Sequence, residues 1–409
     1  MNKEYITFKQ KEVSVKLRSS DIDSIRVKDI ERHAVRVYRD QKIGISGAIG
    51  SVSRKTLEAQ AIDNLSANIP YNYPLESQRI DHRCLTKREY SDIDLLQLTE
   101  KLLTSLKETH DDFIFSESIK AITVDQKFHN TLGLDLRYRD HYLELGFLVK
   151  AKTSTNLMDT YLQWSGRQFD EYRFIQFARQ FLNAERNSVA LPKEEKVPVF
   201  FVSLSAIEIF FMKHLNGEIY GNHASLFEGK LGKKLFHDKL ILSQNHHSPE
   251  TYSSFFDMEG RVNPNDKVAL IDKGVFKRVY TDKKTAKTFD LEYTGGASGG
   301  YDDVPSLRYA KIMPEVDSNS IHHTLGDKPA ILVLFAEGGE VNAEGQYATP
   351  VQAAYLMKGE TLIGKCPEFN MSNHVFDMFG KDYIGTFTLN EMYIGENQHL
   401  TGCYMQILK

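Results

Sequence analysis

The residues best suited to metal chemistry lie in one short stretch, "FFMKHLNGEIYGNHASLFEGKLGKKLF", residues 210–236. His214 and Glu218 are four residues apart, so a continuous helix would place both side chains on one face. Imidazole nitrogens and carboxylate oxygens are zinc ligands, and His223 follows five residues later as a candidate third ligand. The stretch allows two interpretations, a small metal site built from these three residues or the end of a core helix.

A second candidate is a serine nucleophile. Gly296, Ser298 and Gly300 match the Gly-x-Ser-x-Gly elbow, and Asp317 and His322 follow in the chain order of α/β-hydrolases. In such a triad the histidine takes the serine proton and the aspartate orients the histidine. The elbow also needs a helix after the serine, whereas the next residues, "YDDVPSLRYAKIMPEV", contain two prolines and no helical repeat. We therefore interpret the match as a glycine-rich turn.

Two histidine pairs, His246-His247 and His322-His323, are also potential metal ligands. Adjacent side chains of an extended strand point to opposite faces, so neighbours rarely share one ion. We expect these histidines to lie in surface loops.

The glycines of residues 44–50 lie between an expected strand and an expected helix, which is where a phosphate-binding loop would lie. The segment lacks the Gly-Lys-Ser/Thr ending that supplies the phosphate-binding lysine and the magnesium ligand. A small-residue turn is the simpler interpretation.

The elements expected before residue 187 are hairpins and helices. Alternation and a turn at residues 39–41 predict a hairpin over residues 22–47, and a turn at residues 130–133 joins two further strands. Helices are expected from Arg54, after a Ser53 cap, and over residues 91–110 and 169–186. The predicted inward side chains of the last two helices are Ile93, Leu96, Leu103 and Leu106, and Phe169, Tyr172, Phe177 and Phe181.

The pattern changes after residues 187–198, a segment with two prolines and a charge run that is typical of a linker. A strand and a helix beginning near residue 203 follow, and then short strands separated by glycine-rich turns. We predict an α+β protein: a mixed α/β domain over residues 1–195, then a largely antiparallel, barrel-like or sandwich domain over residues 196–409.

Composition excludes several classes of function. The 409-residue chain has 51 basic and 55 acidic residues, so its net charge of -4 draws it neither to nucleic acid nor to anionic membranes. Cys84, Cys366 and Cys403 lie far apart, which argues against a disulfide framework and a thiolate zinc knuckle. No apolar run approaches the ~20 residues of a membrane span, and no signal peptide is evident. We expect a cytoplasmic protein.

Several motifs in order give the chain a resemblance to a known family. They are "YRDQKIGISG" from residue 38, "FHNTLGLDLRY" from 128, "LFEGKLGKKLF" from 226, and the long run from "FFDMEG" at 255 to "TGGASGG" at 300. Together they resemble the TldD/PmbA proteins, once described as modulators of DNA gyrase, whose TldD branch contains zinc metallopeptidases. The Ser298 match falls inside the family's Thr-Gly turn.

The resemblance identifies the stretch around His214 as the family's motif helix. The TldD branch carries His-Glu-x-x-x-His there, with two zinc ligands and a general base. Alignment on Gly217 places Lys213, His214 and Glu218 at these three positions, so no role is kept. The family's third ligand is a cysteine near the carboxyl end. Residues 382–402 contain none, and Cys403 falls later, in an expected last strand.

This pattern is similar to that of the PmbA branch, also called TldE, which lacks the zinc motif and accompanies a TldD-like peptidase. The resemblance implies no catalytic residue and no metal in this chain, with zinc expected only in a TldD-like partner. It implies a homodimer or a heterodimer with that partner, and unfolded or extended peptides as ligands. The alternatives are a homodimeric peptide-binding scaffold without a peptidase and a peptidase with a metal site rearranged around His214, Glu218 and His223.

Overall fold

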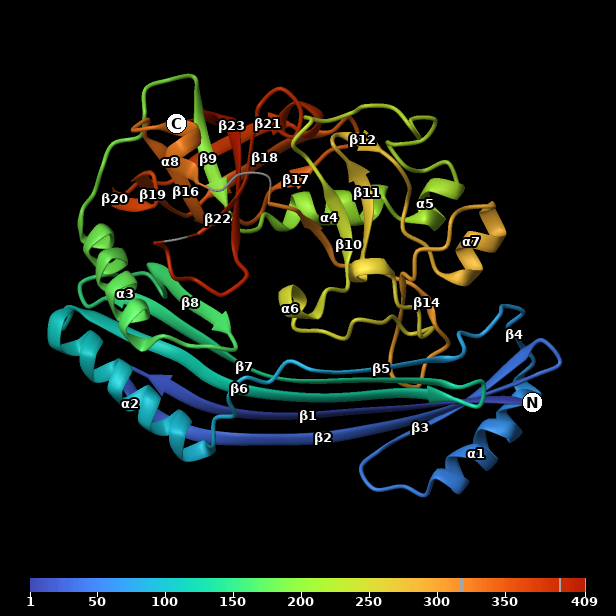
Figure 1. Cartoon of the computed structure of the whole chain (residues 1–409). Coiled ribbons are helices and arrows are strands. Elements are labelled where there is room, and N and C mark those ends of the chain that lie inside the picture. The colour runs from blue at the N-terminus through green and yellow to red at the C-terminus, as the bar shows by residue number, and fades with distance from the viewer. Residues whose placement is uncertain (317–319, 390, 409) are drawn as a thin grey trace.

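A long, twisted sheet of eight strands forms the base of the molecule (Figure 1). The computed structural model describes residues 1–316, 320–389 and 391–408. The strand order is β4-β3-β2-β1-β6-β7-β5, and β8 pairs with β7 beside β5. The strands are β1 (Asn2–Arg18), β2 (Asp21–Arg39), β3 (Lys42–Ile49), β4 (Ile69–Pro70), β5 (Arg79–Cys84), β6 (Phe113–Asn130), β7 (Leu134–Ala151) and β8 (Thr160–Gly166). The hairpin expected over residues 22–47 is confirmed as β2 and β3.

Helices α1 (Arg54–Asp63) and α2 (Asp92–Thr109) lie beneath this sheet, and a 3₁₀ turn, Asn64–Ala67, follows α1 (Figure 1). Both helices were predicted. Ser91 begins α2 with a capping box, in which its hydroxyl accepts from the Asp94 amide and the Asp94 carboxylate accepts from the Ser91 amide.

Two of the predicted inward side chains are wrong. Ile93 of α2 is 68% exposed, and Tyr172 of α3 (Glu171–Arg186) is 72% exposed. The helical repeat that faces the core runs through Leu95 and Leu102 in α2 and through Phe174 in α3. Ile93 and Tyr172 each precede the first buried residue of their helix by two positions, about 200° around the helix axis, so their side chains point away from the core.

The second half of the chain begins with β9 (Lys196–Phe201), so the last residues of the expected linker are strand. Its strands are β9, β10 (Leu242–Asn245), β11 (Lys267–Asp272), β12 (Val275–Phe276), β13 (Ala297–Ser298), β14 (Ser306–Leu307), β15 (Ile312–Pro314), β16 (Ala330–Phe335), β17 (Glu340–Val341), β18 (Gln346–Val351), β19 (Ala353–Lys358), β20 (Thr361–Lys365), β21 (Phe369–His374), β22 (Tyr383–Thr388) and β23 (His399–Leu408). Its helices are α4 (Ser205–His214), α5 (Gly217–Gly221), α6 (Ser248–Thr251), the 3₁₀ turn Pro264–Asp266, α7 (Lys283–Phe289), α8 (Ile321–Leu325) and α9 (Val375–Met378).

These strands form a nine-stranded sheet and two small ones. The large sheet has the order β17-β18-β21-β23-β9-β16-β19-β20, with β22 on β23, and the small sheets have the orders β12-β11-β10-β15 and β13-β14. Almost all pairs are antiparallel, with β5–β7 and β9–β16 parallel. The expected α+β class is confirmed. The expected barrel is not observed, because within the described residues the large sheet ends at β17 and β20, and the end of β20 instead meets the segment after α3 through a Lys365–Asn187 backbone hydrogen bond.

A buried arginine joins the two halves of the chain. Arg167, just after β8, forms a bidentate ion pair with Asp140 of β7, with nitrogen–oxygen distances of 2.8 and 2.6 Å. The same guanidinium donates to the carbonyls of Ser248 and Pro249 in the second half, at 2.8 and 2.7 Å. Because the Asp140 side chain is fully buried and that of Arg167 is 7% exposed, the pair is shielded from solvent.

Replacing Arg167 by leucine should reduce the free energy of unfolding by about 3–5 kcal/mol, because Asp140 would remain buried without its cation. Urea denaturation measures this change. The matched control is Arg137→Leu, which breaks the ion pair between Arg137 and Asp135 on β7. The Arg137 side chain is 52% exposed, so this substitution should cost about 1 kcal/mol or less. Equal losses in both variants would contradict the role given to Arg167.

No helix within residues 1–316, 320–389 and 391–408 is both long and apolar enough to cross a membrane.

Candidate functional site

The motif helix, α4, follows β9 directly and packs its apolar side into the core of the second half. Leu204, Ile207, Phe211 and Leu215 are all buried. The helix ends at His214, and Leu215 leaves helical geometry with φ -94° and ψ 2°. The motif positions therefore lie at the end of the helix and not in its middle.

The chain restarts as a new helix, α5, only three residues later. Asn216 caps α5, with its side-chain oxygen accepting from the amides of Glu218 and Ile219 at 2.9 and 3.2 Å. Gly217 lies so close to the Tyr280–Thr281 backbone that a Cβ atom there would approach the Tyr280 carbonyl oxygen to 2.9 Å. The expectation of one continuous helix with His214 and Glu218 on the same face is therefore wrong. The chain leaves helical geometry at Leu215, and Asn216 caps a separate helix.

His214 is buried and serves as a hydrogen-bond acceptor. Its ring lies 4.7 Å from the ring of Phe210, and its Nδ1 accepts from the Leu226 amide at 3.1 Å. Burial lowers the pKa of His214 to about 4, and the adjacent Lys213 charge adds to the shift. The imidazole is therefore neutral with its proton on Nε2, so neither nitrogen offers a free lone pair to a metal.

The other motif residues point to solvent or to other partners. Lys213 and Glu218 are exposed. His223 pairs with Glu228 at 2.5 Å, and the His223 side chain is 77% exposed. Within the described part of the chain, no group of three or more histidine, cysteine, aspartate or glutamate residues is arranged to hold a metal. The structure does not bring His214, Glu218 and His223 together as one ligand set.

The cysteines are all free and provide no ligand group. Cys403 lies in the last strand, β23, as expected, and is fully buried between β9 and β22. Burial raises its pKa well above that of an ordinary thiol. Cys366 is buried and Cys84 is exposed.

The serine candidate has none of the elbow's geometry. Ser298 lies in the two-residue strand β13, paired with Ser306 of β14, and the next helix in the described chain is α8, beginning at Ile321. His322 is exposed on α8, and Asp317 lies outside the described residues. The interpretation as a glycine-rich turn agrees with these positions.

Two of the smaller expectations need correction. Gly44 and Gly47 lie inside β3 rather than in a turn, because their missing side chains let α1 and residues 301–302 approach the strand. His246 and His247 are partly buried rather than surface residues, and His247 pairs with Glu250 at 3.0 Å. His322 and His323 are exposed, but on a short helix rather than in a loop.

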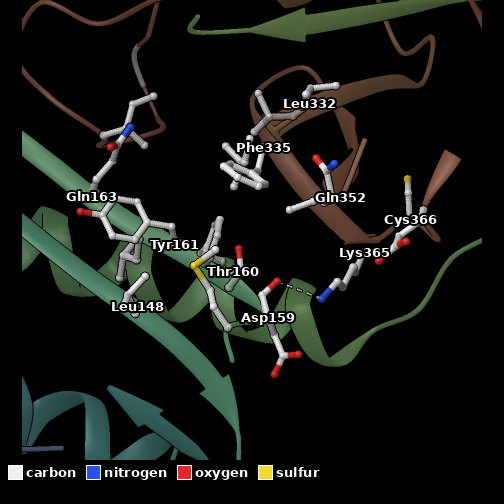
Figure 2. Close-up of a pocket in the computed structure, with 18 of the residues that line it drawn as sticks. Leu148, Asp159, Thr160, Tyr161, Gln163, Leu332, Phe335, Gln352, Lys365 and Cys366 are labelled. Atoms are coloured by element: carbon white, nitrogen blue, oxygen red, sulfur yellow. Dashed lines mark hydrogen bonds between the residues drawn. The ribbon is translucent and has the colours of Figure 1, made fainter. Parts of the chain in front are cut away.

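A cavity of about 1020 Å³ lies between the two halves, and the sequence did not indicate it. Figure 2 shows Tyr161 and Gln163 of β8 on one side and Leu332, Phe335 and Gln352 on the other. Apolar side chains from α3 and from the ends of β9 and β16 dominate its walls: Phe177, Phe181, Val202, Leu332, Val333, Leu334 and Phe335.

A polar network closes one end of the cavity. The Lys365 amine lies 2.5 Å from a carboxylate oxygen of Glu185 and donates to the Asp159 carbonyl at 3.2 Å (Figure 2). The Tyr355 hydroxyl donates to Glu185 and lies 2.8 Å from the Thr160 hydroxyl. Burial raises the pKa of Glu185, against the opposing effects of Lys365 and Tyr355. The network links α3 and β8 to β19 and β20.

The β8 strand lies at the edge of its sheet and borders the cavity. It pairs with β7 through residues 160–166, and with no other strand in the part of the chain that the structure describes. An edge strand has unpaired backbone N–H and C=O groups that can pair with another extended chain. The site therefore combines an apolar cavity with a strand edge, of which the Ser165 carbonyl already accepts from the Glu396 amide at 2.9 Å.

Comparison with known proteins agrees with this architecture. Residues 194–393 match the model of the PmbA/TldA metallopeptidase C-terminal domain. An uncharacterized protein of Methanocaldococcus jannaschii is 22% identical over 394 residues, covering 92% of this chain and 89% of that protein.

Two solved structures share the fold along the whole chain. TldE from Thermococcus kodakarensis aligns with a TM-score of 0.80 at 17% identity, covering 100% of this chain and 97% of that one. A proposed modulator of a DNA gyrase from Thermotoga maritima aligns with a TM-score of 0.79 at 17% identity, covering 100% and 95%.

Residues 194–393 therefore form a PmbA/TldA metallopeptidase C-terminal domain, and the whole chain shares the fold of the TldE structure and of the gyrase-modulator structure.

The state of His214 predicts a specific loss of stability in acid. The unfolded chain binds a proton at this residue below about pH 6.5, whereas the folded chain does not bind it until about pH 4. As the pH falls across that interval, protonation of His214 in the unfolded chain should lower the free energy of unfolding by about 1.4 kcal/mol for each pH unit.

Urea denaturation between pH 7 and pH 4.5 tests this expectation by comparing the wild type with His214→Gln. The variant keeps a hydrogen-bond acceptor and has no titrating group, so its stability should fall less steeply. His223→Gln, at an exposed position, is the control and should follow the wild type. Identical slopes in all three proteins would contradict a buried neutral imidazole.

Proposed function

We propose that this chain is a non-catalytic, TldE-like subunit that pairs with a TldD-type zinc peptidase and binds extended peptide segments for it. The observation that carries the proposal is the state of the motif helix. Lys213 is a solvent-exposed ammonium group, His214 is a buried acceptor with its proton on Nε2, and Glu218 lies on a different helix. Zinc and the general base are thus expected in the partner, and we place the complex in the cytoplasm.

The cavity supports the peptide-binding part of this role. Its volume of about 1020 Å³ accommodates several residues of an extended chain, which advances about 3.3 Å per residue. Backbone pairing along β8 would bind peptides without regard to sequence, while the apolar walls would favour bulky hydrophobic side chains. Such segments are exposed in unfolded polypeptides and buried in folded ones.

The cavity also favours one alternative, a homodimeric peptide-binding scaffold that works without a peptidase. Both hypotheses predict peptide binding, and they differ in what the chain associates with. A metal site rearranged around His214, Glu218 and His223 would require the Leu226 amide to lose its acceptor and the α4–α5 break to reform as one helix.

The pairing is tested by mixing the purified chain with a TldD-type chain from the same genome that carries His-Glu-x-x-x-His. Sedimentation velocity should show a heterodimer, elemental analysis should find zinc in the partner alone, and cleavage of an unfolded protein should require both chains. A stable homodimer that binds peptides but does not associate with the TldD-type chain would favour the scaffold hypothesis. Stoichiometric zinc in this chain alone would contradict both.

Peptide binding in the cavity is tested by replacing Phe335 with arginine. This side chain lines the cavity and is 41% exposed, so the substitution should be tolerated by the fold while placing a charge on the apolar wall. Affinity for a fluorescent, unfolded peptide rich in leucine and phenylalanine should fall at least about tenfold, or about 1.4 kcal/mol, in fluorescence anisotropy.

Tyr172→Arg is the matched control, since Tyr172 is 72% exposed on α3 and does not line the cavity. It should bind the peptide as the wild type does. Binding unaffected by Phe335→Arg would place the peptide elsewhere, and equal losses in both variants would indicate a general charge effect.

A further inference from the structure

A second cluster of buried charges joins the two halves at the end of the long sheet opposite α3 (Figure 1). Here residues 255–262 of the second half rest on the sheet. Phe255, Phe256 and Val262 are buried against a group from β6 and β7 that includes Phe128 and Leu134. Arg36 of β2 donates to the Met258 carbonyl at 2.6 Å. We call residues 255–262 the docking loop.

The docking loop carries two buried carboxyl groups, Asp257 and Glu259, in different environments. Asp257 accepts from three backbone amides, those of Glu259, Arg261 and Ala297, at 2.9, 2.8 and 3.1 Å. Glu259 accepts from the Tyr71 hydroxyl at 3.0 Å and from the Lys283 amide at 3.1 Å. Three amide donors stabilise an anion, so Asp257 is the member of the pair that ionises first.

The cations at this junction already face other anions. Arg36 lies 3.7 Å from Glu4, which also accepts from the Tyr38 hydroxyl at 2.6 Å. The Lys283 amine lies 3.4 Å from Glu76 and 5.6 Å from the centre of the Tyr293 ring. Arg261 of the docking loop lies 4.0 Å from Glu76. Further titratable or charged groups around the cluster are Tyr73, Asp282, Lys284, Asp303 and Arg308. No ion pair to Asp257 or Glu259 occurs within the described residues.

Burial and the neighbouring charge hold a proton on this pair at neutral pH. Burial raises the pKa of Asp257 to about 6, although its three amide hydrogen bonds and Lys283 oppose the shift. Burial, and after it the Asp257 charge, raise the pKa of Glu259 to about 8, against the opposing effect of Lys283. Two interacting carboxyl groups in a buried site rarely ionise together.

We propose that a proton held on the buried Glu259 carboxyl group is a latch that keeps the docking loop on the sheet, and that its loss releases the loop while both halves stay folded. The two halves would then remain joined at α3 and at Arg167, so release at this end would let the second half move about the other. The latch is independent of peptide binding and of any partner chain.

The direction of the effect follows from proton linkage. In a released loop Glu259 is hydrated and titrates near its usual value of about 4.3, so the released state binds fewer protons at neutral pH. Opening should therefore become more favourable as the pH rises from about 5 to about 8, and should level off above the pKa of Glu259.

Hydrogen–deuterium exchange read by mass spectrometry tests the latch. Exchange is expressed as protection factors, which remove the intrinsic dependence of amide exchange on pH. In the wild type, the protection of peptides covering residues 255–262 should fall at least about tenfold between pH 6 and pH 8. Peptides from β1 and β6 should keep their protection.

Glu259→Gln removes the titrating group. Its amide oxygen can accept from the Lys283 amide while its NH2 group donates to the Tyr71 hydroxyl oxygen, so protection of the docking loop should become independent of pH. Glu144→Gln is the matched control, because Glu144 is another partly buried carboxyl with a raised pKa, away from this junction. It should behave as the wild type does.

The wild-type data alone can overturn the proposal if Glu259→Gln does not fold. Protection of the docking loop that does not change with pH excludes the latch. An equal fall in β1 and β6 means general destabilisation and also excludes it. If Glu259→Gln folds and the protection of its docking loop still falls as the pH rises, another group causes the pH dependence and the proposal is excluded.

Discussion

The structure depends on charges that are buried where the two halves meet. Arg167 satisfies both oxygens of Asp140 and two carbonyls of the second half with one guanidinium group, a geometry that lysine could not reproduce. A buried ion pair adds little net stability compared with apolar packing, but leaving one member unpaired is costly. The arrangement therefore permits one relative placement of the halves and penalises others.

This placement creates the cavity and leaves β8 at an edge. The second half contacts the sheet through the apolar cluster around α3 at one end and through the docking loop at the other. Between these two ends Tyr142 of β7 packs against Tyr252, with ring centroids 4.9 Å apart, and the cavity lies beside β8 and α3. An unpaired strand edge is a hazard on an open surface, and enclosing it between two halves limits access to chains that can enter extended.

The sequence predicted local structure well and contacts between distant residues poorly. Periodicity and capping located α1, α2, α3 and the β2–β3 hairpin, because these depend on neighbouring residues. The break before Gly217 had a local signal, since Asn followed by Gly is typical of a turn or cap. The cavity had none, because it forms between β8 and β16, about 170 residues apart. The Asp257–Glu259 pair was visible as a family motif, but its buried charges depend on Tyr71 and Lys283 from elsewhere.

The substitutions at the motif positions are consistent with one another on electrostatic grounds. His214, at the position that the resemblance aligns with the family's glutamate, is buried among aromatic rings. A carboxylate at such a site, without zinc nearby, would carry a large desolvation cost, whereas a neutral imidazole can accept the Leu226 hydrogen bond without charge. Lys213 on the exposed side further disfavours a protonated imidazole. A neutral acceptor at position 214 and a solvated charge at position 213 therefore both fit the packing of α4, and neither leaves a charge buried without a partner.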